Sequence, residues 1–318
     1  MKQILAQPSP ADSAVAAQPA LARLVIIGTG LIGASFALGL KQAKYVAQIV
    51  GLDRSEAALA QALQLGIIDQ ASTDPAQALA DADLVVLAAP VAQTGAILRS
   101  IAPYIQPQTV VTDCGSTKSD VVEVAREVLA DKLAQFVPAH PIAGRELNGP
   151  VAALADLYQG KKLIICRLPE NTEAQITRVK QAWQACGAVI HELSAVEHDA
   201  VFAAVSHLPH LLAYTLVAEL SERSNAALFF DYAASGFRDF TRIAGSSPEM
   251  WRDISLANRD AILTELDAYL AHAHRLRSAL LASDGAALID LYSKAQAARL
   301  NWGERIEAAE KAARDGGD

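Results

Sequence analysis

Short, continuous runs of apolar and β-branched residues alternate with longer Ala- and Leu-rich stretches from about Leu21 to Leu193. The runs lack the polar–apolar alternation of a strand with one face in water, so both faces of each strand should be covered. Seven segments have this pattern: 24–28, 48–53, 84–90, 109–113, 135–140, 162–168 and 188–193. Continuous apolar strands separated by helices predict a doubly wound α/β domain with a parallel sheet.

The pattern changes at Ser194, after which the strand runs stop and the chain has almost wholly the periodicity of helices. The length of 318 residues also favours two domains over one. We therefore expect an α/β domain over residues 21–194 and an all-α domain over residues 195–318. Residues 1–20, rich in Ala, Pro, Gln and Ser, are expected to form a disordered leader.

Composition narrows the class of protein. Hydrophobic residues make up 52% of the chain but aromatic residues only 5%, which is typical of an aliphatic core and argues against disorder. The net charge of −8 argues against a nucleic-acid partner or a membrane surface recognised through basic residues. The longest uncharged stretch, Leu24 to Leu40, has 17 residues and four glycines, which is short for a membrane span.

The cysteines and the N-terminus indicate the compartment. Cys114, Cys166 and Cys186 are odd in number, far apart and contain no CxxC pair, a pattern that fits a reducing environment. The first residues contain no apolar run of signal-peptide length. We therefore expect a cytoplasmic protein.

A glycine-rich turn follows the first predicted strand and opens the first predicted helix. It consists of Gly28, Thr29, Gly30, Leu31, Ile32 and Gly33. In such a turn Gly28 permits the tight bend, Gly30 lets the backbone approach a pyrophosphate, and Gly33 allows close packing of helix on strand. The helix N-terminus would offer N–H groups to the anion. A packing turn is the alternative, but strand, glycines and helix in register favour a Rossmann-type dinucleotide site.

Asp53 stands at the end of the second predicted strand, twenty residues after Gly33. A carboxylate there would accept hydrogen bonds from an adenosine ribose and repel a 2′-phosphate, which favours NAD over NADP. Arg54 leaves NADP open, because its guanidinium could pair with a 2′-phosphate, lie over the adenine or remain solvated.

Ser116 and His140 both come at the ends of predicted strands. The carboxyl ends of parallel strands border the ligand crevice in such folds, so both side chains should lie near the nicotinamide end. Ser116 is also a natural N-cap for a helix beginning near Lys118, and His140 could simply bond to backbone. Cys114 is best interpreted as a small buried hydrophobe.

Arginines concentrate in one segment of the otherwise acidic helical domain. Arg238, Arg242, Arg252 and Arg259 all fall within residues 236–259, where we expect an anion site. Arg238 and Arg252 are expected to pair with the adjacent Asp239 and Asp253. Arg242 is the predicted anion-binding residue.

Two histidines, His207 and His210, open an apolar helix in the second domain. Their spacing could suggest metal ligands, but Pro209 between them and the lack of a third clustered ligand argue against a metal site. Trp251, in the following segment, could simply be a half-buried core aromatic.

Five segments together resemble the prephenate/arogenate dehydrogenase family of tyrosine biosynthesis. They are GTGLIG (28–33), DCGSTK (113–118), HPIAGRE (140–146), SHLPH (206–210) and GFRDFTRIAGSSPEMWRDI (236–254). The resemblance implies an N-terminal Rossmann-type domain and an all-α C-terminal dimerisation domain, hence a homodimer. It also implies NAD(P)-dependent oxidative decarboxylation of prephenate to 4-hydroxyphenylpyruvate, or of arogenate to tyrosine. Ala234-Ser235-Gly236 departs from the family, in which a double glycine is common before the phenylalanine.

The resemblance also assigns roles. His140 would hydrogen-bond the substrate hydroxyl and take up its proton. Ser116 would hold His140 or the same hydroxyl, and Arg242 would hold a substrate carboxylate. Supporting positions in the family correspond here to His207, His210, Glu146, Asp239 and Trp251. Glu146 would pair with the substrate arginine.

Two other classes of protein would show different residues at specific positions of the sequence. Hydroxyacid dehydrogenases usually place a catalytic Lys on the first long helix of the second domain, and residues 197–220 contain no Lys. A dinucleotide-sensing module that had lost its chemistry would be expected to lose Ser116, His140 or Arg242, all of which are present. Prephenate is the favoured substrate, with arogenate or dual specificity as the alternative.

Overall fold

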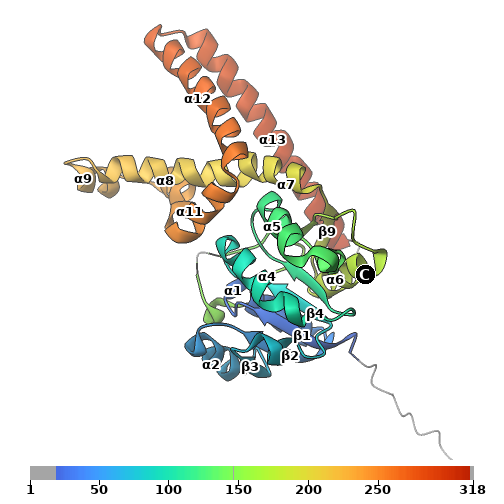
Figure 1. The fold of residues 1–318 in the computed structure, drawn as a ribbon. Coiled ribbons are helices and arrows are strands. Elements are labelled where there is room, and N and C mark those ends of the chain that lie inside the picture. Colours follow the sequence, from blue (N-terminus) through green and yellow to red (C-terminus); the bar gives the residue numbers. More distant parts are fainter. Residues whose placement is uncertain (1–18, 146, 316–318) are drawn as a thin grey trace, which may run out of the picture.

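The computed structural model describes residues 19–145 and 147–315. Residues 19–192 contain all the described strands, and residues 195–315 form only helices in the part of the chain that is described. We call these the N-terminal part and the helical part. The predicted leader falls almost wholly outside the described residues. Figure 1 shows the helical part extending away from one edge of the N-terminal part.

Six parallel strands form the main sheet, in the order β3-β2-β1-β4-β5-β6. They are β1 Leu21–Ile27, β2 Val46–Leu52, β3 Gln70–Ser72, β4 Leu84–Leu87, β5 Val110–Asp113 and β6 Phe136–Val137. The direction of the strand order reverses between β1 and β4, and a crevice for ligands forms at such a point, beyond the carboxyl ends of the strands. The predicted doubly wound parallel sheet is therefore confirmed.

Helices cover both faces of this sheet, which explains why its strands are apolar throughout. The helices are α1 Leu31–Gln42, α2 Glu56–Gln64, α3 Pro75–Leu79, α4 Thr94–Ile101, α5 Ser119–Leu129 and α6 Glu173–Ala185. Leu24 and Ile26 pack with α1, α2 and α6, whereas Val25 and Ile27 pack with α3, α4 and α5 on the other face. Short turns are η1 Val91–Gln93, η2 Ala102–Tyr104, η3 Ala130–Gln135 and η4 Pro150–Ala152.

A second, three-stranded sheet corrects the prediction in detail. The apolar runs at 162–168 and 188–193 do not join the main sheet but form β8 Lys162–Ile165 and β9 Val189–Glu192. Their neighbour is β7 Ala139–Pro141, which pairs antiparallel to β8. The predicted strand 135–140 divides at Pro138, because proline has no N–H to donate to a ladder. His140 thus lies on the small sheet.

The helical part contains a helical hairpin whose connecting turn lies away from the sheets (Figure 1). The hairpin is formed by α12 Arg259–Leu281 and α13 Gly285–Asp315. The preceding elements are α7 Ala195–Phe202, η5 Ala203–His207, α8 Leu208–Ser221, α9 Ala226–Asp231, α10 Ser235–Thr241, η6 Arg242–Gly245 and α11 Pro248–Ala257.

α7, η5 and α8 form one continuous helical stretch in which η5 is a π-helical turn. Ser194 begins it with a capping box, in which its hydroxyl accepts from the Glu197 N–H and the Glu197 carboxylate accepts from the Ser194 N–H. By length and composition alone this 27-residue stretch, in which one window of 18 residues has a mean hydropathy of 1.5, could cross a membrane. Its buried polar residues His198 and Asp199, however, bond to the N-terminal part, so α7 packs within the protein.

We predict that Gly33→Ala destabilises the fold by about 2–3 kcal/mol, because overpacking against rigid neighbours forces backbone shifts. A Cβ on Gly33 would lie 2.4 Å from the Gly28 carbonyl oxygen and 2.6 Å from Cγ2 of Ile26. Gly30→Ala is the matched control, since a Cβ there meets nothing within 4 Å. Denaturant unfolding of both variants tests this, and equal stabilities would contradict it.

Candidate active site

Two adjoining cavities form a continuous groove along the carboxyl ends of the main-sheet strands. One, of about 510 Å³, reaches Asp53 and Arg54, and the other, of about 440 Å³, reaches Ser116 and His140. They share the lining residues Gly30, Ala88, Ala89 and Pro90. The groove therefore runs from the predicted adenosine end to the predicted chemical end past the glycine-rich turn.

The glycine-rich turn has the geometry that a pyrophosphate needs. Gly28 has a φ of +95°, and a Cβ there would lie 2.7 Å from the Ala88 carbonyl oxygen. Gly30 is the N-cap of α1 and has open space in front of it, with no side chain capping the helix end. The N–H groups of the first turn of α1 thus face the groove at the positive end of the helix dipole. These residues fit a dinucleotide.

Backbone N–H groups of the glycine-rich turn and of Ser55 hold the Asp53 carboxylate. Its Oδ2 accepts from the Thr29 N–H at 3.2 Å, and its Oδ1 accepts from the Ser55 N–H at 2.9 Å. The carboxylate borders the groove with acceptor capacity left for ribose hydroxyls. Arg54, also at this end, donates to Oε1 of Gln93 at 3.0 Å.

A buried ion pair shapes the loop that carries Ser116. The Lys118 ammonium, fully buried, donates to Oδ2 of Asp113 at 2.6 Å, and the same oxygen accepts from the Gly115 N–H at 2.8 Å. Oδ1 of Asp113 accepts from the Ala139 N–H at 3.0 Å, which ties this loop to the strand of His140. The loop geometry is therefore set by charge-assisted hydrogen bonds within the N-terminal part.

Ser116 does not cap α5, contrary to one interpretation of the sequence. The helix begins at Ser119 without a side-chain cap from its own N-cap residue, Lys118. Instead the Asp199 carboxylate, from α7, accepts from the N–H groups of Lys118 at 2.8 Å and Ser119 at 2.7 Å. Because an acid from another element takes the capping role, the Ser116 side chain is not used for it and lines the cavity beside His140.

His140 lies on β7, opposite Ile164 of β8, and lines the same cavity. Its ring packs edge-on against His198, with centroids 5.1 Å apart, and against Phe202 at 5.0 Å. Burial, to which the charge of the Lys118 ammonium adds, holds the pKa of His140 well below its ordinary value. His140 is therefore neutral near pH 7, as a proton acceptor must be.

His198 and Asp199, both buried in the first turns of α7, were not expected from the sequence. Nδ1 of His140 lies 2.8 Å from Nε2 of His198, and Nδ1 of His198 lies 2.8 Å from Oδ1 of Asp199. An adjacent His-Asp pair just inside a capping box, in an otherwise apolar helix, was the available signal. Such polar residues are buried only when their hydrogen bonds are satisfied.

The helical part borders the cavity at His140 through Ser246, Ser247, Met250 and Ile254, and we call this side the helical wall. His207 and His210 lie behind it, where Trp251 of α11 packs against both. Trp251 stacks on His210 with centroids 3.7 Å apart and meets the His207 ring edge-on at 6.1 Å. Nδ1 of His210 donates to the Ser206 carbonyl, and Nδ1 of His207 lies 3.0 Å from the Asn258 amide. Burial lowers the pKa of His207 to about 4, so this ring is neutral too. The described residues hold no cluster of three metal-ligating side chains.

Arg242 and Asp239 also belong to the helical part, but neither is among the described residues that line the cavity at His140. Arg242 begins η6, which packs against α8, and the end of this turn is tied down by the Tyr214 hydroxyl, which donates to the Ser246 carbonyl at 2.7 Å. Oδ1 of Asp239, on α10, lies 3.7 Å from Nε of Arg238, its predicted partner. Glu146 is outside the described residues. The cavity at His140 is lined, among the described residues of this wall, by Ser246, Ser247, Met250 and Ile254.

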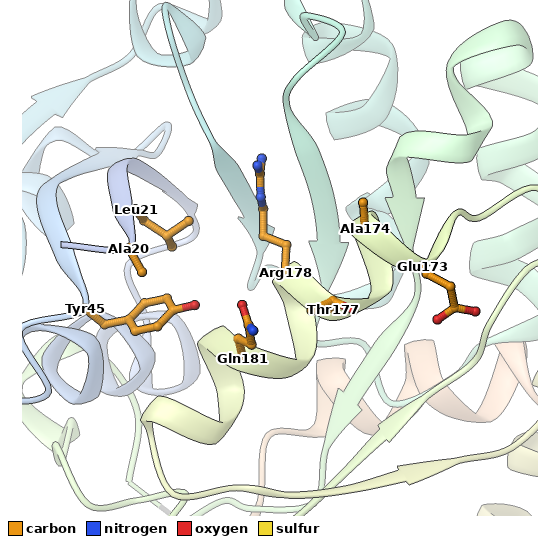
Figure 2. A pocket seen from close by; sticks show the side chains of 8 residues that line it. All are labelled: Ala20, Leu21, Tyr45, Glu173, Ala174, Thr177, Arg178 and Gln181. Atoms are coloured by element: carbon orange, nitrogen blue, oxygen red, sulfur yellow. The ribbon is translucent and has the colours of Figure 1, made fainter. Parts of the chain in front are cut away.

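A separate hollow of about 480 Å³ lies on the N-terminal part, between the start of β1 and α6 (Figure 2). Its lining includes Tyr45, Thr177 and Arg178. The Arg178 guanidinium already donates to the carbonyls of Asp83 and Gln108. Because this hollow borders the amino ends of the strands, it is remote from the groove, and we assign it no role.

Comparison with known proteins identifies the family. Residues 36–192 match the nucleotide-binding domain of prephenate dehydrogenase, and residues 194–293 match its dimerization domain. A cyclohexadienyl dehydrogenase of Zymomonas mobilis is 36% identical over 87% of this chain and 94% of its own. The chain belongs to the prephenate dehydrogenase family. A prephenate dehydrogenase of Bacillus subtilis is 35% identical over 86% of this chain and 74% of its own.

Solved structures of the prephenate dehydrogenase family share this fold. The crystal structure of the prephenate dehydrogenase from A. aeolicus, in complex with hydroxyphenyl propionate and NAD+, superposes with a TM-score of 0.83. It is 32% identical and covers 88% of this chain and 98% of its own. The family and fold class expected from the five motifs are thus confirmed. The matched nucleotide-binding domain begins after the glycine-rich turn, so the assignment of that turn rests on its own geometry.

Proposed function

We propose that this protein is an NAD-dependent prephenate dehydrogenase, which oxidatively decarboxylates prephenate to 4-hydroxyphenylpyruvate in tyrosine biosynthesis. The observation that carries the proposal is the single groove that joins a dinucleotide turn to a neutral, partly buried histidine, His140. Family membership supplies the substrate class. Arogenate, in which an amino group replaces the side-chain keto group, is the alternative substrate.

NAD fits the adenosine end better than NADP. The Asp53 carboxylate borders the groove and would accept from both ribose hydroxyls, whereas a 2′-phosphate would meet like charge. Arg54 is engaged with Gln93 and lies beside the groove, where it would cover the adenine. Bound NAD would supply the hydride acceptor, with its nicotinamide directed toward Ser116 and His140.

The chemistry asks the protein for a proton acceptor and for positioning. As the ring carbon loses its hydride, the hydroxyl proton passes to His140 and the carbon becomes a carbonyl. The C–C bond to the ring carboxylate then breaks, CO₂ leaves, and the electron pair moves through the ring to the oxygen. His140 returns its proton to that oxygen, which completes the phenol. Because aromatisation drives the second step, His140 needs only to be neutral at the start and oriented throughout.

Substrate anchoring is assigned to the helical part. Arg242 is proposed to hold a carboxylate as a planar, bidentate fork, and Ser116 to hold the substrate hydroxyl near His140. His207, His210 and Trp251 would line the substrate pocket, with Asp239 and Glu146 supporting Arg242. Arg242 begins η6, which packs on α8, the helix that carries His210.

The helical part is proposed to form a homodimer. Large apolar side chains stand exposed on several of its helices, which is unfavourable unless another surface covers them. They include Leu228, Tyr232, Leu256, Leu263, Leu280, Leu281, Ile289 and Tyr292. The match to a dimerization domain over residues 194–293 supports a second copy as that surface. Sedimentation at twice the mass of one chain is expected, and a monomer would refute it.

A cytoplasmic location is proposed from the cysteines. Cys114, Cys166 and Cys186 are all free thiols. Burial raises the pKa of Cys166 and of Cys186 to about 12 and also raises that of Cys114, so the thiols remain protonated and unreactive. Such thiols suit a reducing compartment.

The function is tested by following cofactor reduction at the absorbance of NADH for prephenate and arogenate, each with NAD and NADP. We expect the highest kcat/KM for prephenate with NAD, because of Asp53 and the family match. If no pair reduces cofactor, the enzyme proposal is wrong. If arogenate turns over best, the alternative substrate replaces prephenate.

Two variants should separate chemistry from binding. His140→Asn removes the proton acceptor and is expected to lower kcat by about 10²–10⁴ with little change in KM. Arg242→Gln removes a charge-assisted contact and should instead raise the KM for substrate strongly. Unchanged kcat in His140→Asn, or unchanged KM in Arg242→Gln, would reject the corresponding role.

The pH dependence of the wild type is a separate test. Because protonated His140 cannot accept the hydroxyl proton, kcat/KM should fall as pH drops through a pKa below the ordinary histidine value.

A further inference from the structure

We propose that His198 and Asp199 form a positioning dyad for His140, which fixes its tautomer so that Nε2 is the free acceptor and stabilises the imidazolium when it forms. The catalytic consequence rests on the proposed function, but the tautomer does not. Neither residue was expected from the motifs, and both come from α7 rather than from the strand that carries His140.

The direction of each hydrogen bond follows from the one group that can only accept. An ionised carboxylate has no proton to give, so Nδ1 of His198 must donate to Oδ1 of Asp199, 2.8 Å away. Nε2 of a neutral His198 is then an acceptor, and Nδ1 of His140, 2.8 Å away, must carry the proton. Nε2 of neutral His140 is left with a lone pair. This is the form that accepts a hydroxyl proton.

The surroundings keep Asp199 ionised and His198 neutral. Burial opposes the charge on Asp199, but hydrogen bonds from His198 and from the Ser119 and Lys118 amides lower its pKa. Burial lowers the pKa of His198, and so does Lys118, against the opposite effects of Asp199 and Asp113. His198 has no exposed surface. No water therefore competes for its two ring nitrogens.

The dyad also supports His140 during the reaction. When Nε2 takes up the hydroxyl proton, the positive charge that forms is shared with an Nδ1–H directed at His198 and, beyond it, at the Asp199 carboxylate. A hydrogen bond to the charged form favours that form. The proton then returns from Nε2 to the phenolic oxygen, so the dyad ends each turnover unchanged. His198 and Asp199 touch neither substrate nor cofactor and are positioning residues.

Asp199 links this histidine pair to the loop of Ser116. Its two oxygens accept from Lys118 and Ser119 at the start of α5 as well as from His198. Replacing Asp199 would therefore disturb α5 together with the histidines. His198 separates the two roles, because its ring nitrogens bond only to His140 and Asp199 among the described contacts.

The tautomer can be read directly by ¹H–¹⁵N NMR of the histidine rings in the wild-type protein, with His140 assigned from the His140→Asn spectrum. We expect a proton on Nδ1 of His140 and none on Nε2 at neutral pH. A proton on Nε2 would overturn the proposal. This measurement needs no substrate, so it remains decisive if prephenate is not oxidised, an outcome that would refute only the proposed function.

Kinetics of His198 variants test the consequence. His198→Phe keeps a ring against Phe202 but removes both nitrogens, and is expected to lower kcat by about 10–100-fold, the usual effect of losing an orienting partner, with KM unchanged. Its acid limb in kcat/KM should move to lower pH, because the imidazolium loses its acceptor. His198→Gln restores an acceptor near Nε2 and should recover most of kcat.

The controls keep these outcomes decisive. His191→Phe, an exposed histidine of β9, should leave kcat unchanged. A His198→Phe variant with kcat within twofold of the wild type, or a His198→Gln variant as impaired as His198→Phe, would overturn the dyad. If His198→Phe does not fold, the wild-type tautomer and the His198→Gln rate decide.

Discussion

The buried carboxylate of Asp199 is the constraint on which the arrangement of the site depends. It satisfies three N–H donors, two from the start of α5 and one from His198, and so joins the N-terminal part to α7. A buried anion is stable only with such partners, because removing any one of them leaves a buried charge whose loss of hydration is no longer compensated. Asp113 acts similarly within the N-terminal part, through Lys118, Gly115 and Ala139. Together the two acids fix the strand end of His140 relative to the loop of Ser116.

This arrangement gives the two ends of the groove different physical characters. At the glycine-rich turn, backbone N–H groups and open space suit a large anionic cofactor that binds and leaves. At the other end, burial keeps His140 and His207 neutral, so their rings offer uncharged nitrogens. Neutral rings of this kind can take a proton from a hydroxyl but add no positive charge that would attract anions generally.

The parts that sequence could predict are those with a local signature. The glycine-rich turn combines a strand, three glycines and a helix within a dozen residues, and Ser116 follows the end of β5, which an apolar run reveals. His140, by contrast, lies within β7 of the small sheet and not at the end of a main-sheet strand. The small second sheet was missed because strand pairing partners are nonlocal, and β3 because its three residues carry no pattern. The dyad was missed for the same reason. The role of His198 and Asp199 depends on their hydrogen bonds with His140 and Ser119, which lie 58 and 80 residues away in the chain.

The π-helical turn η5 limits the changes in length that this part of the chain can accept. A π turn holds one more residue than an α-helical turn, so the segments before and after it are rotated relative to a regular helix by about 100°. His198 and Asp199 precede η5, whereas His207 closes it and His210 follows. Loss of a single residue within Ala203–Val205 would restore a regular helix and swing both later histidines away from Trp251, while the dyad stayed in place. Length in this segment is therefore as constrained as residue identity.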